Sequence, residues 1–291
     1  PHPYWCPVDA PEAISDTTLV ISVKDVCSTS ASMLRHTAQT FGRNFSVVYA
    51  YPSFPGCDVV PWRELRLFRG DIHVLALDAT SPPLEGFVRA KAMVHTQFAL
   101  FLHNDVFAMD AWALCELVYA LRSHPDAVFA SPQILERGAN GVAVPHGHHT
   151  HLCRHDDYMI NYELDPDLLT RRYPSDFPNG EAQQDFMEDH VFLGRTAVFD
   201  KYLDINASFT MEHIDTILNQ RMDNLTVWSV PTSRFYFDVN HTALQWNDIA
   251  YFSFKRSDVF GEAVIAHLNR KWAPLWFPTT RVWDFLRHDA F

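Results

Sequence analysis

The chain has 291 residues, of which 47% are hydrophobic and 20% are charged, and its formal net charge is −12. This composition predicts a packed globular core and excludes global disorder. It also argues against nucleic acid as a partner, because an acidic surface without a local cluster of Lys and Arg repels phosphates. No apolar run reaches the roughly 18 residues of a membrane helix, so membrane attachment is expected only through a segment absent from this chain.

The first part of the chain alternates between apolar runs and helical patterns. Residues 1–16 are rich in Pro and are expected to form a stem or arm. Strands are predicted at 18–23, 45–51, 72–77 and 97–102, and helices at 28–41, capped by Ser28 or Ser30, and at 84–96. This alternation predicts an α/β fold with a doubly wound, mostly parallel sheet flanked by helices.

The second part of the chain contains a long irregular segment. A helix at 110–123 and a strand at 127–130 precede residues 137–185, which show little periodicity and are expected to form an insertion or surface loop. The later elements are predicted as a strand at 190–193, helices at 196–202 and 212–222, and a strand at 225–230 that ends at Pro231. No linker is visible, so a single domain is expected over 17–291, with halves of about 17–106 and 107–291.

The most informative segment runs from Gln97 through an apolar stretch to the polar triplet His103-Asn104-Asp105. An apolar run of this length is typical of a strand buried on both faces of a parallel sheet. Ligands of such sheets bind outside the carboxyl ends of the strands. Asp105 is therefore expected where a carboxylate can meet a metal ion or a phosphate-bearing ligand. The alternative is that Asp105 only caps the following turn.

Cysteines and glycosylation sequons indicate the secretory pathway. Cys6, Cys27 and Cys57 lie near the start of the chain, where they are candidates to pair in an oxidising lumen, whereas Cys115 is interpreted as a buried thiol. No cysteine spacing is typical of a zinc site. Four N-x-S/T sequons favour a glycoprotein, and they begin at Asn44, Asn206, Asn224 and Asn240.

Three segments resemble the GT-A glycosyltransferases, most closely their family 2-like group, over residues 17–242. Residues 19–41 resemble the strand and helix that open the nucleotide-sugar half. Residues 88–105 resemble the helix and strand that lead to the D-x-D triplet, which here is His103-Asn104-Asp105. Residues 189–199, followed by Glu212-His213-Ile214-Asp215, resemble an acceptor-side strand and the acidic E-D motif that opens a helix.

The resemblance implies a hexosyl- or pentosyltransferase that uses a nucleotide-sugar donor, with UDP-sugars favoured, and a glycan or glycoprotein acceptor. It also implies Mn²⁺ or Mg²⁺, which neutralises the departing diphosphate and prefers oxygen ligands, Mn²⁺ also accepting imidazole. The ligands predicted for this metal are Asp105, His103 and His241. Because only one acid remains in the triplet, a catalytically inactive domain that binds glycans or a partner is the alternative.

An inverting transfer needs a base that takes the proton of the acceptor hydroxyl. The candidates are Glu212, Asp215 and His213; Glu212 and Asp215 share one helix face. The alternative is that these acids only favour the helix dipole. Donor-binding roles are predicted for residues after the first strand, on the helix before the apolar run and in the triplet: Lys24, Asp25, Arg89, Lys91 and Asn104. A solvated helix face would explain Arg89 and Lys91 equally well.

The His-rich segment from His146 to His155 allows two interpretations. A zinc site, in a metal-dependent hydrolase, would use closely spaced imidazoles. A solvated loop is favoured because Gly147 interrupts the segment and no helical H-E-x-x-H frame is present. Together with the sequons, the resemblance implies a protein of the Golgi or ER lumen, the ectodomain of a type II membrane protein.

Overall fold

Strands and helices alternate along most of the chain. The computed structural model describes residues 14–137, 143–145, 149–155, 158–164, 182–184, 187, 190–208, 212–238, 245–246, 248–255 and 257–273. Its strands are β1 (Thr17–Ser22), β2 (Val47–Pro52), β3 (Ile72–Leu77), β4 (Phe98–His103), β5 (Val106–Ala108), β6 (Ala127–Arg137), β7 (Ala143–Pro145), β8 (His149–His155), β9 (Tyr158–Leu164), β10 (Ala182–Gln184), β11 (Val191–Arg195) and β12 (Thr226–Phe237). Its helices are α2 (Ser30–Thr40), α3 (Trp62–Leu65), α4 (Pro83–Ala90), α5 (Trp112–Ser123), α7 (Glu212–Met222), α8 (Ile249–Lys255) and α9 (Asp258–Lys271), with short 3-10 turns η1 (Cys27–Thr29), η2 (Lys91–Met93), η4 (Phe199–Lys201) and η5 (Ile205–Ala207).

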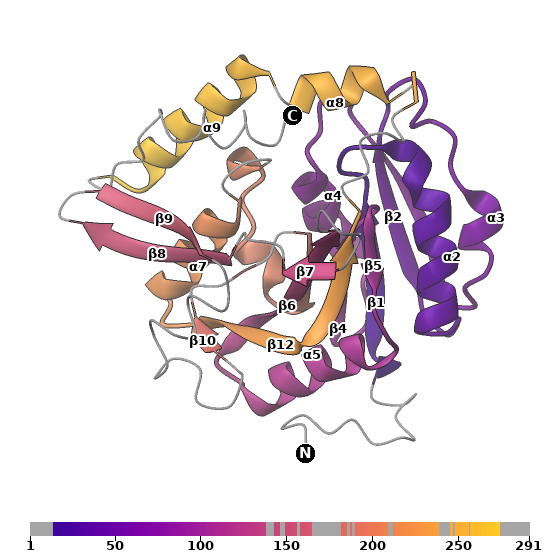
Figure 1. Ribbon diagram of the computed structural model, residues 1–291, viewed down its shortest axis with the longest axis horizontal. Helices are drawn as coiled ribbons and strands as arrows, with labels where there is room; N and C mark the ends of the chain where they lie inside the picture. Colours follow the sequence, from indigo (N-terminus) through magenta and orange to yellow (C-terminus); the bar gives the residue numbers. More distant parts are fainter. Residues whose placement is uncertain are drawn as a thin grey trace.

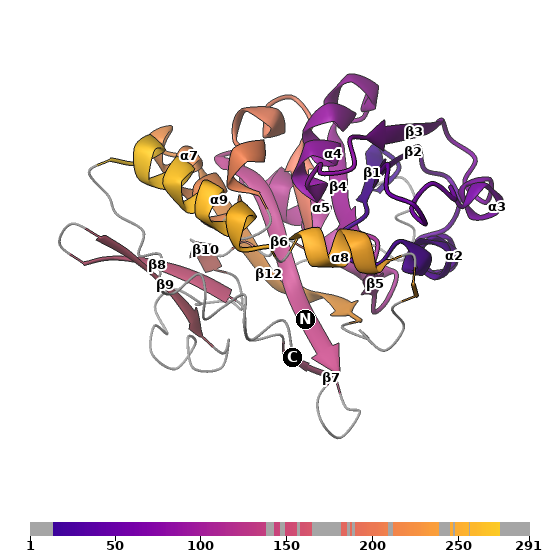
Figure 2. The same ribbon diagram turned by 90° about the horizontal axis from the view of Figure 1, so that it is seen from above.

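The central sheet follows the order β10-β12-β6-β11-β4-β1-β2-β3, with β5 and β7 paired to β12 and β6 (Figure 1). β3, β2, β1 and β4 are parallel to one another, and β6 is parallel to β12. β11 lies antiparallel between β4 and β6. The predicted α/β architecture with a mostly parallel sheet is thus confirmed. A separate β8–β9 hairpin lies on the α7 side of the molecule, as a second view shows (Figure 2).

The centre of the sheet is buried on both faces. Every residue of β1 and β4 is buried. One face packs against Leu34 of α2 and Leu117 of α5. The opposite face packs against Phe87 of α4 and Ile217 of α7. A strand covered on both sides needs apolar side chains in both directions, which is why β4 was recognisable as an uninterrupted apolar run.

Gly86 allows α4 to approach the sheet closely. A Cβ at this position would lie 2.7 Å from the Cβ of Ala50 and 2.7 Å from the Oγ of Ser22. Gly86→Ala is expected to destabilise the protein by about 1–3 kcal/mol through overpacking, although helix propensity alone favours Ala by about 1 kcal/mol. Urea denaturation measures this difference. Gln39→Ala, on the exposed side of α2, is the control and should change the free energy of unfolding by less than about 0.5 kcal/mol. Equal effects would contradict the packing argument.

Two predicted helices are shorter than expected. The helix predicted over 84–96 ends at Ala90 and is followed only by η2, because Val94 is extended and the Thr96 hydroxyl bonds to the carbonyl of Phe98. The helix predicted over 196–202 is only the turn η4. There the carbonyl of Thr196 accepts a hydrogen bond from the Lys91 ammonium, so a side chain takes the acceptor that a helix would use.

The segment after β6 contains more strand than predicted. β7 pairs with β6, β10 pairs with β12, and β8 pairs with β9, so the expectation of an irregular insertion over 137–185 was wrong for these residues. The His-rich segment is likewise strand from His149 to His155. β12 also continues past Pro231, where the sequence predicted its end. The register shifts between Val230 and Arg234, and a proline is tolerated at such an irregularity because no ladder N–H is needed there.

Neither serine predicted to cap α2 does so. The N-cap residue is Thr29, and its side chain makes no capping hydrogen bond. The Ser28 hydroxyl instead donates to Asp248 at 3.2 Å, and the Ser30 hydroxyl accepts from Tyr49 at 2.9 Å. Long-range partners thus take both hydroxyl groups.

A disulfide joins Cys27, in the turn after β1, to Cys57, in the loop after β2, and their Cα atoms are 5.1 Å apart. Pairing among the first cysteines is therefore confirmed. Cys115 is also disulfide-bonded, so its interpretation as a buried thiol was wrong. Disulfides persist in oxidising compartments and are rare in the cytosol.

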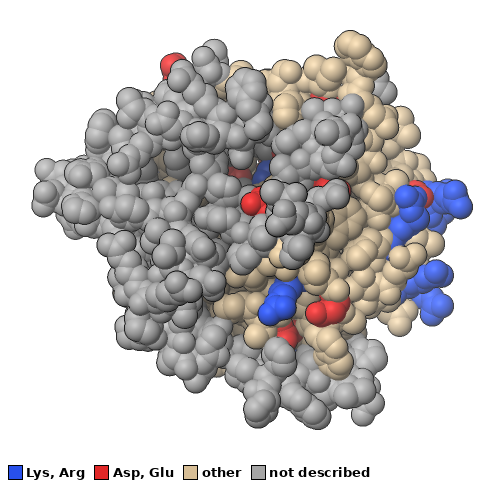
Figure 3. All heavy atoms as spheres, in the orientation of Figure 1, with Lys and Arg blue, Asp and Glu red and all other residues tan. Residues whose placement is uncertain are grey.

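Basic side chains gather at the edge formed by α2 and α3 (Figure 3). This gathering corrects the expectation that no local cluster of Lys and Arg interrupts the acidic surface. Sequence separation hid the cluster, because α2 and α3 belong to different crossovers of the sheet. Its exposed members on and beside these helices are Arg35, Arg43, Arg63, Arg66 and Arg69.

Candidate active site

The carboxyl ends of β1 and β4 lie side by side in the sheet. Ser22 and His103, the last residues of the two strands, are register partners. β1 pairs with β2 on one side and with β4 on the other, so the strand order reverses between β1 and β4. Loops that leave such a switch point diverge and open a crevice, which is where ligands bind in α/β sheets. The residues that follow β1 and β4 are therefore the candidate site.

Asn104 fixes the two diverging loops to each other. Its side chain is fully buried. The amide oxygen accepts from the backbone N–H of Lys24 at 2.9 Å. The amide nitrogen donates to the carbonyl of Val26 at 2.6 Å and to the hydroxyls of Thr29 and Ser30 at 2.9 and 3.0 Å. Because the protein itself uses both ends of this amide, Asn104 holds the shape of the site, and we do not retain the predicted direct contact with the donor.

Lys24 extends from the end of β1 toward the far side of the site. Its Nζ lies 2.5 Å from Nε2 of His190 and 5.5 Å from the ring centroid of Phe237. His190 precedes β11, and its ring lies 4.1 Å from that of Phe237, the last residue of β12. Three strand ends thus contribute to one cluster. The amino-acid sequence did not reveal His190 as a site residue, since its only signal is its place directly before an apolar strand.

His103 and Asp105, two of the predicted metal ligands, are buried beside this cluster. The His103 ring is stacked on Phe87 of α4 with centroids 5.5 Å apart and meets the His190 ring edge-on at 5.6 Å. The Asp105 carbonyl accepts from the backbone N–H of Asp238 at 3.1 Å, which ties β4 to the end of β12.

These side chains do not by themselves make a metal centre. Among the residues that the structure describes, no group of three or more His, Cys, Asp or Glu side chains is placed to hold a metal ion. The third predicted ligand, His241, lies outside them. The described residues alone therefore do not complete a site for the metal that the resemblance implies.

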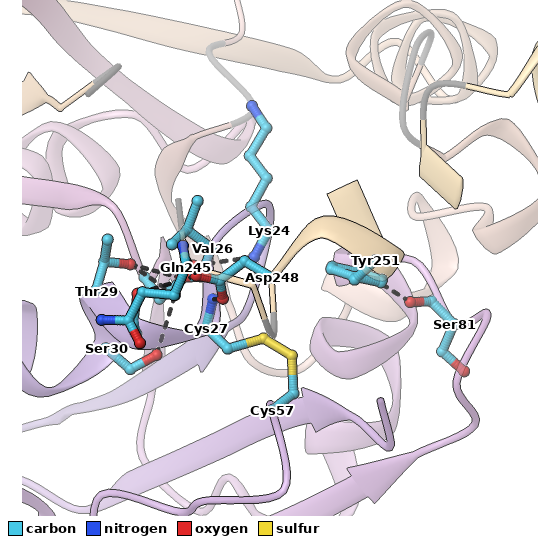
Figure 4. Close-up of a disulfide and its surroundings, with 12 residues drawn as sticks. Lys24, Val26, Cys27, Thr29, Ser30, Cys57, Ser81, Gln245, Asp248 and Tyr251 are labelled. Atoms are coloured by element: carbon cyan, nitrogen blue, oxygen red, sulfur yellow. Dashed lines mark hydrogen bonds between the residues drawn. A yellow bond between two sulfur atoms is a disulfide. The ribbon is translucent and has the colours of Figure 1, made fainter. Parts of the chain in front are cut away.

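Asp25, predicted to bind the donor, is buried, and its charge acts on Tyr251 of α8. Asp248, next to the start of α8, accepts from the backbone N–H of Cys27 at 2.9 Å, and Tyr251 donates to the carbonyl of Ser81 at 3.2 Å (Figure 4). Burial, together with the negative charge of Asp25, raises the pKa of the Tyr251 phenol well above its usual value. The structure therefore places Asp25 at the covered side of the site.

Two predicted phosphate contacts lie at the opposite edge of the sheet. Lys91 bonds to the Thr196 carbonyl and to Asp200, and the N–H of Thr196 bonds to the carbonyl of Gln97, directly before β4. Arg89 is exposed and forms an ion pair with Glu85 of its own helix. A six-residue strand spans about 17–20 Å, so Lys91 and Arg89 are separated from Lys24 by the length of β4. We therefore leave both out of the site.

The predicted base candidates lie on α7, and the structure divides them. Asp215 is 0% exposed and accepts from Lys271, Trp272 and Asn219, each at 2.8 Å. Burial raises the pKa of this carboxyl, and the Lys271 ammonium offsets part of the rise. Its contacts are those of a structural ion pair that joins α7 to α9, which does not agree with a role as base. Glu212, the first residue of α7, is buried, and His213 beside it is half-buried.

Lys271 also pairs with Asp204, in front of η5, at 2.8 Å, where His267 contributes a further contact at 2.9 Å. Burial raises the pKa of the Asp204 carboxyl, but hydrogen bonds from Lys271 and His267 outweigh burial and hold it well below its usual range. This ion-pair network joins α9 to α7 and to the residue before η5.

Comparison with solved structures identifies the fold. No family model and no curated protein matches the sequence. The crystal structure of GalNAc-T7 with UDP, GalNAc and Mn²⁺ aligns with a TM-score of 0.60 and 13% identity over 94% of this chain, which spans 54% of that chain. S. aureus TarS, residues 1–349, aligns with a TM-score of 0.50 and 13% identity over 89% of this chain and 72% of that chain. The protein has the GT-A fold of glycosyltransferases.

Proposed function

We propose that this protein is a glycosyltransferase that moves a sugar from a nucleotide-sugar donor, with UDP-sugars favoured, to a glycan or glycoprotein acceptor. The observation that carries the proposal is the convergence of Lys24, His103 and Asp105 at the switch point of a GT-A sheet. A crevice of this kind is where α/β proteins bind nucleotides. The neighbour GalNAc-T7 was crystallised with UDP and Mn²⁺, which supports UDP as the first ligand to test.

The reaction that we propose inverts the anomeric carbon. An acceptor hydroxyl attacks that carbon while the bond to the diphosphate oxygen breaks, and a base removes the hydroxyl proton. We propose Glu212 as this base, with His213 as the next candidate. α7 and β12 are consecutive and packed together, and a short turn joins them, so they run in opposite directions. The N-terminus of α7 therefore points toward the edge at which β12 ends beside Asp105.

Assistance by a divalent metal stays a prediction. Asp105 would supply a carboxylate oxygen and His103 or His241 an imidazole, which suits Mn²⁺ better than Mg²⁺. A bound cation would neutralise charge on the departing diphosphate.

Binding of UDP is expected to raise the thermal midpoint. At 100 times its dissociation constant a ligand adds about 2.7 kcal/mol of stability, which corresponds to roughly 5–10 °C for a domain of this size. A thermal-shift series with UDP, GDP and their sugars, each with EDTA or with Mn²⁺, measures the effect and tests the metal prediction in the same plate. Adenosine diphosphate is the control nucleotide. The absence of a shift with every uridine and guanosine ligand under both conditions would refute the proposed function.

An inactive GT-A domain that binds glycans or a partner is the second candidate. Two observations favour it: the Asn104 amide forms its hydrogen bonds within the protein, and the His103 ring stacks on Phe87. Asp105 is then the one acid of the triplet. Release of UDP from UDP-sugars during long incubations separates the two. Donor hydrolysis that Glu212→Gln abolishes would support the enzyme, whereas nucleotide binding without any hydrolysis or transfer would support the second candidate.

We also propose that the protein works in the lumen of the Golgi or ER. The Cys27–Cys57 disulfide supports an oxidising compartment. Among the described residues, Asn44, Asn206 and Asn224 of the sequons are exposed, as glycan attachment requires. Within the same residues, no helix combines the length and the apolar character needed to cross a membrane.

A further inference from the structure

The cluster around Lys24 places a positive charge at the switch point. Lys24 follows β1, and the backbone N–H of this residue is fixed by the Asn104 amide at 2.9 Å. In Figure 4 its side chain extends away from the Cys27–Cys57 disulfide and the Asp248 contacts. The Lys24 ammonium therefore projects from an anchored backbone, at the edge where the sheet binds its ligands.

Two aromatic residues hold this ammonium group. Nε2 of His190 lies 2.5 Å from Nζ, so the ammonium donates to a neutral imidazole. The Phe237 ring lies 5.5 Å from Nζ, within the range of a cation–π contact. His190 and Phe237 also pack on each other, and the carbonyl of His190 accepts from the N–H of His103 at 2.9 Å. Both contacts restrict where the Lys24 ammonium points.

We propose that Lys24 binds the diphosphate of the donor and that His190 and Phe237 position it. This inference rests on the proposed function. During transfer the bond between the acceptor oxygen and the anomeric carbon forms, the bond from that carbon to the diphosphate oxygen breaks, and both electrons of the broken bond leave with the nucleoside diphosphate. The acceptor proton goes to the base. Lys24 keeps its proton and stabilises the charge that accumulates on the leaving group.

The charge-assisted hydrogen bond of an ammonium to phosphate is among the stronger contacts that a protein makes. Lys24→Ala is therefore expected to weaken UDP binding about 10- to 100-fold, as measured by calorimetric titration. Uridine, which lacks phosphate, should bind the variant and the natural protein equally. Lys24→Arg should recover most of the UDP affinity. Lys91→Ala, which removes a lysine at the opposite edge of the sheet, is the matched control and should leave UDP binding unchanged.

His190 has its own test as a positioning residue. His190→Phe keeps a ring on Phe237 but removes the nitrogen that accepts from Lys24, and it is expected to weaken UDP about 3- to 10-fold without changing uridine. His190→Gln restores an acceptor and should recover affinity. A purely structural role of His190 would weaken uridine and UDP alike.

The outcomes separate this inference from the function on which it rests. If UDP binds the natural protein and Lys24→Ala leaves its affinity unchanged, or reduces uridine and UDP binding equally, the Lys24 assignment is overturned and the glycosyltransferase proposal remains. If the natural protein binds neither UDP nor GDP, with or without Mn²⁺, both are overturned. Lys24→Gln keeps the length of the side chain and replaces the Ala variant if that variant does not fold.

Discussion

Lys271→Met is expected to lower the free energy of unfolding by about 3 kcal/mol, because removal of one partner leaves a buried charge uncompensated. Lys271 donates to both Asp204 and Asp215, and Asp215 is 0% exposed. Methionine keeps the aliphatic stem, so the change isolates the ammonium group. The expected loss lies at the low end of the range for buried pairs, since the Lys271 side chain is 25% exposed. Urea denaturation of the two proteins measures it.

The acid dependence of stability provides a second measurement of the same network. The pKa of Asp204 lies below its usual value, mainly through Lys271 and His267 against the opposing effect of burial. A carboxyl with a lowered pKa contributes stability above its unfolded pKa of about 3.9 and loses it as the pH falls further. Lys271→Met should therefore flatten the loss of stability below about pH 4.

The control for Lys271 is an ion pair within one helix, in which the Arg89 side chain is 52% exposed. Arg89→Ala breaks the contact with Glu85 of α4 and should cost about 0.3–0.5 kcal/mol. Similar losses for the two variants would show that the α9 network is no more than a surface pair, and Asp215 would return as a candidate base.

Removal of the Cys27–Cys57 disulfide is expected to cost about 3–4 kcal/mol, from the entropy of a closed loop of about 30 residues in the unfolded chain. The bond joins residues 30 positions apart. The double change Cys27→Ser and Cys57→Ser is compared with the natural protein by urea denaturation. The same variant should bind UDP more weakly, because Cys27 lies in the loop that Asn104 and Asp248 anchor behind Lys24.

A pair of surface changes separates the cross-link from the substitution itself. Ser32→Ala with Ser53→Ala alters two exposed residues near the same loops and should change the free energy of unfolding by less than about 1 kcal/mol. An unaltered denaturation midpoint in the cysteine variant would show that hydrogen bonds alone hold the loop after β1.

The sequence predicted those elements whose pattern is local. β1, β2 and β4 appear as apolar runs because both sheet faces are covered there, and this burial leaves a direct trace in the sequence. β10 left no such trace, since it pairs with β12, more than 40 residues further along the chain. The continuation of β12 through Pro231 depends on a register shift, which only the pairing strand β6 can reveal.

The residues of the site also divide into those with a local signal in the sequence and those that depend on distant partners. Lys24 and Asp105 were predictable because the carboxyl ends of adjacent parallel strands meet whatever their side chains are. His190 was not predictable from local pattern, because β11 enters the sheet from the opposite direction. The structural role of Asp215 depends on Lys271, 56 positions away. Lys91 was predicted to bind the donor from its charge alone, and charge does not indicate at which end of a strand a residue lies.

The contact of Asp248 with the turn after β1 has a consequence for biosynthesis. Its carboxylate receives the N–H of Cys27, the hydroxyl of Ser28 and the N–H of Gln245. The loop after β1 therefore reaches its finished form only after Asp248, 221 positions later in the chain than Cys27, has been synthesised.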